Sequence, residues 1–225
     1  MGIRGPLAPN EHYHLYNRGT DRRVIFNTQA DYERFLGLLY LSNNTQPTNL
    51  SNYRGSTLTQ WLEVERQEPL VDIYAYCLMP NHFHLLVRQR EEGGVSRFMQ
   101  KLVTGYTMYF NKINDRTGSL MQGKFKSSHA DSDQYFKHLF SYIHLNPVKL
   151  IDPKWKEAGI ADKAQARTYL ETYRYSSYLD YCGKERPESA IINKSAALEF
   201  AEVPTDFKNS VEEWLSNGAE HLNEV

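Results

Sequence analysis

The sequence predicts an α+β fold whose first six elements follow the order β-α-β-β-α-β. Residues 12–18 alternate between polar and apolar side chains and predict a strand. Residues 71–78 and 82–88 predict two more strands, and the turn between them, Met79 to Asn81, contains residues that favour a hairpin. Helical periodicity over 95–114 precedes a further extended stretch. This element order is that of ferredoxin-like folds with an antiparallel sheet.

The remaining elements complete this core. Residues 31–41 show an amphipathic helical pattern between the first two strands. Residues 118–130 are basic and extended, and they provide the fourth strand. A last helix is predicted over 131–146, with Asp131 as its N-cap and Pro147 helping to end it. We expect this added helix to lie against the sheet.

The chain divides into a main domain, residues 1–150, and a C-terminal extension, residues 151–225. Within the main domain, residues 42–69 are rich in Asn, Thr, Ser and Gln and are interpreted as an insertion or loop. The extension contains a tyrosine-rich segment, residues 173–181, and ends in an acidic tail with a helical pattern.

The net charge of −1 hides an uneven distribution of charge along the chain. One stretch is basic, with Asp115 as its single acid, and the tail from Lys184 is acidic. The basic side chains of that stretch are Arg97, Lys101, Lys112, Arg116, Lys124 and Lys126. Such a stretch is either a phosphate-binding surface or a solvated helix face, and the composition does not choose between them.

The two cysteines, Cys77 and Cys182, form neither a CxxC pair nor a disulfide framework. The N-terminus lacks an apolar signal core, and no apolar stretch is long enough to span a bilayer. These observations predict a reduced, cytoplasmic protein without a membrane partner.

Two histidine pairs lie on predicted strands. Side chains alternate between the faces of a strand, so His82 and His84 point the same way and could share one metal ion. His12 and His14 have the same spacing. Because surface or hydrogen-bonded histidines are the commoner outcome of this pattern, the spacing alone does not choose between the pairs.

The last predicted helix presents two stripes of side chains. Phe136, Leu139, Phe140 and Ile143 form an apolar stripe that would pack on the sheet. A second, polar stripe contains His138, Tyr142 and Asn146 at intervals of four residues. For an arbitrary helix, Tyr142 would be a half-buried aromatic residue and Asn146 a C-terminal cap.

Several separated motifs, taken in order, resemble the REP-associated tyrosine transposases of the HUH single-stranded-DNA transposase superfamily. The two principal motifs are Tyr76-Cys-Leu-Met-Pro-Asn-His-Phe-His-Leu-Leu-Val87 and Tyr142-Ile-His-Leu-Asn-Pro-Val-Lys149. Shorter similar segments are His14-Leu-Tyr-Asn-Arg-Gly19, Gln122-Gly-Lys-Phe-Lys126 and Tyr175-Ser-Ser-Tyr178. The resemblance covers roughly residues 11 to 183, and residues 42–69 are longer than the connector expected in this family.

The resemblance implies roles for particular residues. His82 and His84 correspond to the metal ligands, Tyr142 to the nucleophile, and Asn146 to the polar residue that completes the metal site. His12 and His14 match no ligand and return to a structural role or to lining a DNA groove. His138 matches no firm family role, and its place near the nucleophile suits an auxiliary proton-transfer or phosphate contact.

The resemblance also implies an activity. The chain is expected to be a single-stranded DNA endonuclease and strand transferase that acts on hairpin-flanked sites through a 5′-phosphotyrosine, with Mg²⁺ or Mn²⁺ as cofactor. Arg97, Lys101, Arg116, Lys124 and Lys126 are its candidate DNA contacts. In this family the nucleophile acts within its own subunit or in a partner's site, so a homodimer is one expected assembly. A protein of this kind would be nucleoid-associated within the cytoplasm.

Two alternatives stay open at this point. The first is a protein that binds REP-type DNA hairpins without cleaving them. The second is a structural zinc site on His82 and His84, which is disfavoured because structural zinc usually takes four protein ligands and the cysteines are badly placed. Tight, stoichiometric zinc in the purified protein would favour the zinc site.

Overall fold

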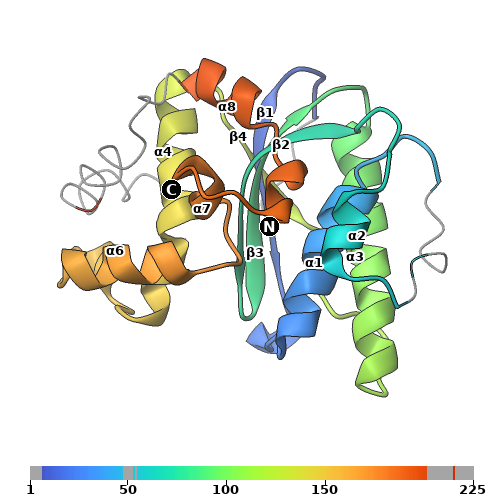
Figure 1. The fold of residues 1–225 in the computed structure, drawn as a ribbon, viewed down its shortest axis with the longest axis horizontal. Helices are drawn as coiled ribbons and strands as arrows, with labels where there is room; N and C mark the ends of the chain where they lie inside the picture. The colour runs from blue at the N-terminus through green and yellow to red at the C-terminus, as the bar shows by residue number, and fades with distance from the viewer. Residues whose placement is uncertain (1–6, 48–52, 54, 202–214, 216–225) are drawn as a thin grey trace.

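Four strands form one antiparallel sheet in the centre of this computed structural model (Figure 1). The structure describes residues 7–47, 53, 55–201 and 215. The strands are β1 (His12–Arg18), β2 (Val71–Met79), β3 (His82–Gln89) and β4 (Lys126–His129), in the spatial order β2-β3-β1-β4. All three neighbouring pairs are antiparallel, as the sequence predicts. The extended stretch at 118–130 contributes only the four residues of β4, so the fourth strand is shorter than predicted.

Helices α1 (Gln29–Leu41) and α3 (Gly94–Ile113) lie on one side of the sheet, and α4 (Asp133–Leu145) lies on the other (Figure 1). α1 begins two residues before the predicted start because Thr28 caps it, with its side chain accepting from the backbone N–H of Asp31. The predicted cap of the last helix was wrong. Ser132, not Asp131, precedes α4 and accepts from the backbone N–H of Tyr135 at 3.3 Å.

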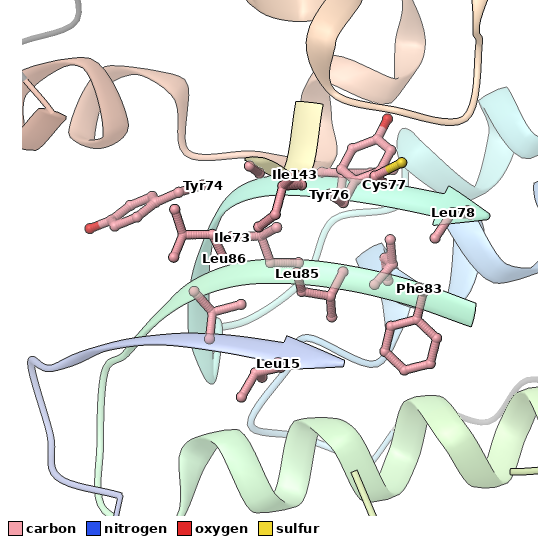
Figure 2. Close-up of a cluster of buried hydrophobic side chains, with 14 of the residues drawn as sticks. Leu15, Ile73, Tyr74, Tyr76, Cys77, Leu78, Phe83, Leu85, Leu86 and Ile143 are labelled. Atoms are coloured by element: carbon pink, nitrogen blue, oxygen red, sulfur yellow. The ribbon is translucent and has the colours of Figure 1, made fainter. Parts of the chain in front are cut away.

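The hydrophobic core fills both sides of the sheet. Figure 2 shows Leu15, Phe83 and Leu85 on one side of the strands and Ile143 of α4 on the other. Phe83 contacts Phe35 of α1 with 5.0 Å between ring centroids. All of these side chains are fully buried, so the predicted apolar stripe of α4 packs on the sheet as expected. This packing fixes the rotation of α4 about its axis and therefore the direction of its polar stripe.

The segment 42–69 packs on α1 through a short helix, α2 (Leu58–Leu62). Gly37 makes this approach possible, because a Cβ added there would lie 2.0 Å from Cε3 of Trp61. The guanidinium of Arg34 covers the same indole at 4.6 Å from its centroid. The described part of the insertion is thus held against the side of the sheet that α1 and α3 cover.

The C-terminal extension follows α4 through a 3₁₀ helix, η3 (Asn146–Leu150). A first 3₁₀ turn, η1 (Thr20–Arg22), follows β1 near the start of the chain. The later elements are α5 (Trp155–Ala158), α6 (Lys163–Thr172), α7 (Tyr178–Tyr181), η4 (Pro187–Ile191) and α8 (Lys194–Ala201). The predicted acidic tail beyond residue 201 lies outside the described residues apart from Leu215.

The tyrosine-rich segment of the extension covers the free edge of β2. The backbone N–H of Ser177 donates to the carbonyl of Tyr76 at 3.0 Å, and that of Leu78 donates to the carbonyl of Tyr175 at 2.9 Å. The side chain of Ser177 also lies 2.8 Å from Nε2 of the buried His144 in α4. These contacts protect the sheet edge and tie α4 to β2.

The predicted domain boundary at residue 150 stays a prediction. None of the described helices is long and apolar enough to cross a bilayer.

Candidate active site between the sheet and helix α4

Strand register places a group of polar side chains on the face of the sheet that α4 covers. In the β1–β3 pairing, Tyr16 lies opposite His84 and Arg18 lies opposite His82. Directly opposed side chains of an antiparallel pair share a face, and so do residues two apart in one strand. His14 therefore joins His82 and His84 on this face.

His82 and His84 lie side by side, with 5.0 Å between their ring centroids. Nδ1 of His82 lies 2.6 Å from Oδ1 of Asn81. The amide nitrogen of Asn81 donates to the carbonyl of Arg22 at 3.2 Å, which fixes the orientation of that amide. Because an amide oxygen only accepts, His82 carries its proton on Nδ1 and its Nε2 keeps a lone pair.

His84 is oriented by His14, one member of the other histidine pair. Nδ1 of His84 lies 2.8 Å from Nε2 of His14, and the two rings stack with 5.0 Å between centroids. Both residues are buried. A hydrogen bond to one ring nitrogen orients the imidazole and leaves the second nitrogen for a ligand. The family resemblance gave His14 no ligand role, and the structure shows that it instead positions His84.

Burial keeps these imidazoles neutral. It lowers the pKa of His14 to about 3 and that of His82 to about 4, and the nearby positive charge of Lys156 adds to both effects. The charges of Lys149 and Arg18 also lower the pKa of His82. Burial likewise lowers the pKa of His84 well below its ordinary value. The site thus combines uncharged imidazoles with a surrounding positive potential, which suits an anionic ligand.

Tyr142 of α4 faces these histidines. Its ring centroid lies 5.5 Å from that of His84 and 6.0 Å from that of His14. Its hydroxyl oxygen accepts a hydrogen bond from Nζ of Lys156 at 2.8 Å. Burial raises the pKa of the Tyr142 phenol, whereas a hydrogen bond from Asn146 and the charge of Lys149 act in the opposite direction. The tyrosine predicted as nucleophile and the two predicted metal ligands therefore lie in one place.

Asn146 is the C-cap residue of α4 and is fully buried. Its Nδ2 donates to the backbone carbonyl of Tyr142 at 2.8 Å, so the capping role considered from the sequence is present. This bond uses the amide nitrogen and leaves Oδ1 available as a ligand. His138 stacks on the other side of Tyr142 at 6.5 Å between centroids, and Tyr135 stacks on His138 at 6.1 Å.

The predicted DNA contacts separate into two groups. Lys126 lies opposite Tyr16 in the β1–β4 pairing, on the face of the site, and Lys124 is exposed just before it. Lys101 of α3 is on the other side of the sheet, where its Nζ donates to the carbonyls of Asn44 and Gln46 at 2.5 and 2.8 Å. The two remaining residues are also paired: Arg97 with Glu91, and Arg116 with Asn111 at 2.8 Å.

Sequence reasoning missed two residues of the site. His14 was visible as half of a histidine pair, but its contact with His84 follows from strand register across 70 positions. No sequence pattern pointed to Lys156, because it lies in a four-residue helix of the extension, which is too short to show a periodic pattern.

The donor set fits a hard to borderline divalent cation. Within the described ranges there is no group of three or more His, Cys, Asp or Glu side chains that could hold a metal ion. The predicted ligands, the imidazoles of His82 and His84 and the amide oxygen of Asn146, would leave positions for phosphate and water and would suit Mn²⁺ better than Mg²⁺.

Comparison with known proteins now assigns the family. Residues 8–146 match the family model described as "Transposase IS200 like", which is more than half of the chain. The chain belongs to the IS200-like transposase family. Its fold is similar to a solved structure described as a REP-associated tyrosine transposase bound to a REP hairpin, with a TM-score of 0.52 and 12% sequence identity over 84% of this chain and 90% of that chain. No curated protein matches the sequence.

The matched segment of this transposase contains most of the site but not all of it. His14, His82, His84 and Tyr142 lie inside residues 8–146, and Asn146 is the last matched residue. Lys156, which contacts the hydroxyl of Tyr142, lies beyond the match.

Proposed function

We propose that this IS200-like transposase nicks and rejoins single-stranded DNA beside a hairpin, with Tyr142 as nucleophile. We also infer that its sheet is the ferredoxin-like core expected from the sequence. The observation that carries the proposal is the position of Tyr142, whose ring lies 5.5 Å from that of His84 while its hydroxyl faces a lysine. A buried aromatic residue with a purely structural role would not need this polar setting.

His82, His84 and Asn146 would hold a divalent cation. When bound, that ion would polarise the phosphodiester and stabilise the departing 3′-oxygen. The protein supplies the rest: Asn81 and His14 fix the two imidazoles, and burial keeps them neutral. Arg18 and Lys149 are exposed beside His82 and would attract the phosphates on either side of the scissile bond.

The reaction follows from these positions. The phenolic oxygen of Tyr142 attacks phosphorus after losing its proton, the bond from phosphorus to the 3′-oxygen breaks, and a 5′-phosphotyrosine and a 3′-hydroxyl result. The phosphotyrosine keeps an ester bond, so another 3′-hydroxyl can attack it and join two strands. Cleavage and strand transfer are therefore the same transesterification in opposite directions.

Hairpin DNA is the proposed partner because the similar solved structure is described with a REP hairpin and because exposed basic side chains lie beside the site. Exposed cations near the site include Arg18 and Lys149, whose charges act on His82, and Lys126, which lies opposite Tyr16. Lys124 is exposed two residues before Lys126. Arg97, Lys101 and Arg116 lie in contacts within the protein, so we propose that they contribute less to DNA affinity.

The proposed function is tested with labelled single-stranded hairpins taken from beside the gene. The protein is incubated with Mn²⁺, with Mg²⁺ or with EDTA, and a denaturing gel reports covalent protein–DNA adducts. An adduct that needs the metal supports the proposal. Binding of the hairpin without an adduct in either metal favours the non-cleaving hairpin-binding protein instead.

His14 gives a separate prediction about the metal. Replacing His14 with Leu should lower Mn²⁺ affinity by about 10- to 100-fold, because His84 loses the hydrogen bond that orients it. Isothermal titration with Mn²⁺ measures this change. The matched control is His12→Leu, which alters a buried histidine on the same strand that packs against Phe136 and Phe200. Equal affinities in the two variants would contradict the role given to His14.

A further inference from the structure

Lys156 reaches the site from outside the segment that matches the family. It lies in α5, where the neighbouring Trp155 is fully buried and anchors the helix. Nζ of Lys156 donates to the hydroxyl oxygen of Tyr142 at 2.8 Å and lies 4.1 Å from the centroid of the same ring. The hydroxyl of Tyr142 is the atom that must lose a proton before it attacks phosphorus.

The surroundings of Lys156 disfavour its charged form. The side chain is half-buried, and among the described residues it takes part in none of the ion pairs with carboxylates. Burial and, after it, the positive charge of Lys149 lower the pKa of Lys156 to about 8, whereas Glu157 acts in the opposite direction. A neutral amine is therefore accessible near physiological pH, within hydrogen-bond distance of the phenol.

Among the described residues, the titratable and charged groups that interact with Lys156 come from α4, α5, η3, β1 and β3. Tyr142 faces it from α4 and Lys149 from η3. His82 and His84 on β3 and His14 on β1 sense its charge, and burial keeps all three neutral. Glu157 follows it in α5 and is exposed.

We propose that Lys156 is a catalytic residue that takes the proton of the Tyr142 hydroxyl during cleavage and returns it during strand joining. This inference rests on the function proposed above. In cleavage, the neutral amine accepts the phenolic proton and becomes an ammonium as the phenolate oxygen bonds to phosphorus. The bond from phosphorus to the 3′-oxygen breaks, and the departing 3′-oxygen takes a proton from solvent water. In joining, the attacking 3′-hydroxyl releases its proton to solvent as its oxygen bonds to phosphorus. The bond from phosphorus to the Tyr142 oxygen breaks and the ammonium returns its proton to the leaving phenolate, so the amine and the phenol are both regenerated.

Three variants separate this role from a structural one. Lys156→Met removes the acceptor and should slow adduct formation by roughly 10²- to 10⁴-fold, the usual contribution of general acid–base catalysis. Lys156→Arg keeps a positive charge beside Tyr142 but cannot accept a proton near neutral pH, so it should stay slow. Lys154→Met is the matched control, because Lys154 is exposed two residues away and its side chain caps nothing.

The pH profile gives the sign of the effect. A base works when it is unprotonated, so the wild-type rate of adduct formation should rise as the pH passes through about 8. That inflection should be absent in Lys156→Arg. A small primary amine such as ethylamine, added to Lys156→Ala, should restore part of the rate. Wild-type rates in Lys156→Met or in Lys156→Arg would overturn the proposal.

A measurement without DNA keeps this test independent of cleavage. In protein labelled with ¹³C-lysine, the signal missing from Lys156→Arg belongs to Lys156, and its shift is followed against pH. We expect a midpoint near pH 8 that changes in Tyr142→Phe. A midpoint near the ordinary lysine value of about 10.4 would overturn the acceptor role. If wild-type protein forms no adduct, the proposed function fails, and this titration still decides whether Lys156 can act as the acceptor.

Discussion

Replacing Tyr142 with Phe is expected to abolish the covalent protein–DNA adduct. Removal of the nucleophile removes the covalent step itself, so we expect adduct formation to fall by at least roughly 10⁴-fold, to below detection on a denaturing gel. The rings of His84 and His14 contact the aromatic ring, not the hydroxyl, so Phe can fill the same space. The variant should therefore fold and still bind hairpin DNA.

The matched control for this change is Tyr135→Phe. Tyr135 is in the same helix, about two turns before Tyr142, and its ring stacks on that of His138. Circular dichroism and hairpin binding check that both variants are folded. An adduct that survives in Tyr142→Phe would mean that another tyrosine is the nucleophile, and peptide mapping of the adduct would then identify it.

Replacing His84 with Ala is expected to remove both divalent metal binding and metal-dependent cleavage. His84 is buried, and its two hydrogen-bonding nitrogens would be divided between the metal and His14. Loss of one of three proposed ligands should cost more than loss of an orienting residue, so Mn²⁺ affinity should fall by more than about 100-fold. Titration with Mn²⁺ and the adduct gel measure the two effects separately.

His129→Ala is the control for this experiment, because His129 is exposed on β4 and pairs with Glu11 at 2.7 Å. Unchanged Mn²⁺ affinity in His84→Ala would remove the proposed metal site. Metal analysis of the purified wild-type protein also tests the structural-zinc alternative, which requires tight, stoichiometric zinc.

The arrangement of the proposed metal site depends on hydrogen bonds as well as on the proposed ligands. Asn81 lies in the turn between β2 and β3 and fixes the tautomer of His82, while His14 orients His84 from the adjacent strand. The loop after β1 contributes too, because the carbonyl of Arg22, a residue with a positive φ of 59°, accepts from the amide of Asn81. This conformation is uncommon for a residue with a side chain, and it places the carbonyl beside the hairpin turn.

Local patterns in the sequence determined most of the core. Alternation predicted the first strand, and the hairpin turn at Met79 to Asn81 marked the next two, all to within a residue or two. Helical periodicity predicted α1, α3 and α4, because a helix with one buried face repeats apolar residues at fixed intervals. The cap of α4 was misassigned because Asp131 and Ser132 are both good capping residues. Only the structure shows that the side chain of Ser132 accepts the hydrogen bond from the backbone N–H of Tyr135.

The sequence by itself determined that His82 and His84 share a face and that Tyr142 and Asn146 lie one turn apart, because each pair is fixed by the period of its own element. The family resemblance placed these pairs in one site, but only the tertiary structure showed that Tyr142 packs against His84, that His14 holds His84, and that Lys156 contacts Tyr142. Those contacts depend on strand register and on how the extension packs. Neither leaves a periodic signal in the chain, because both are set by residues that are distant in sequence and adjacent only in the folded protein.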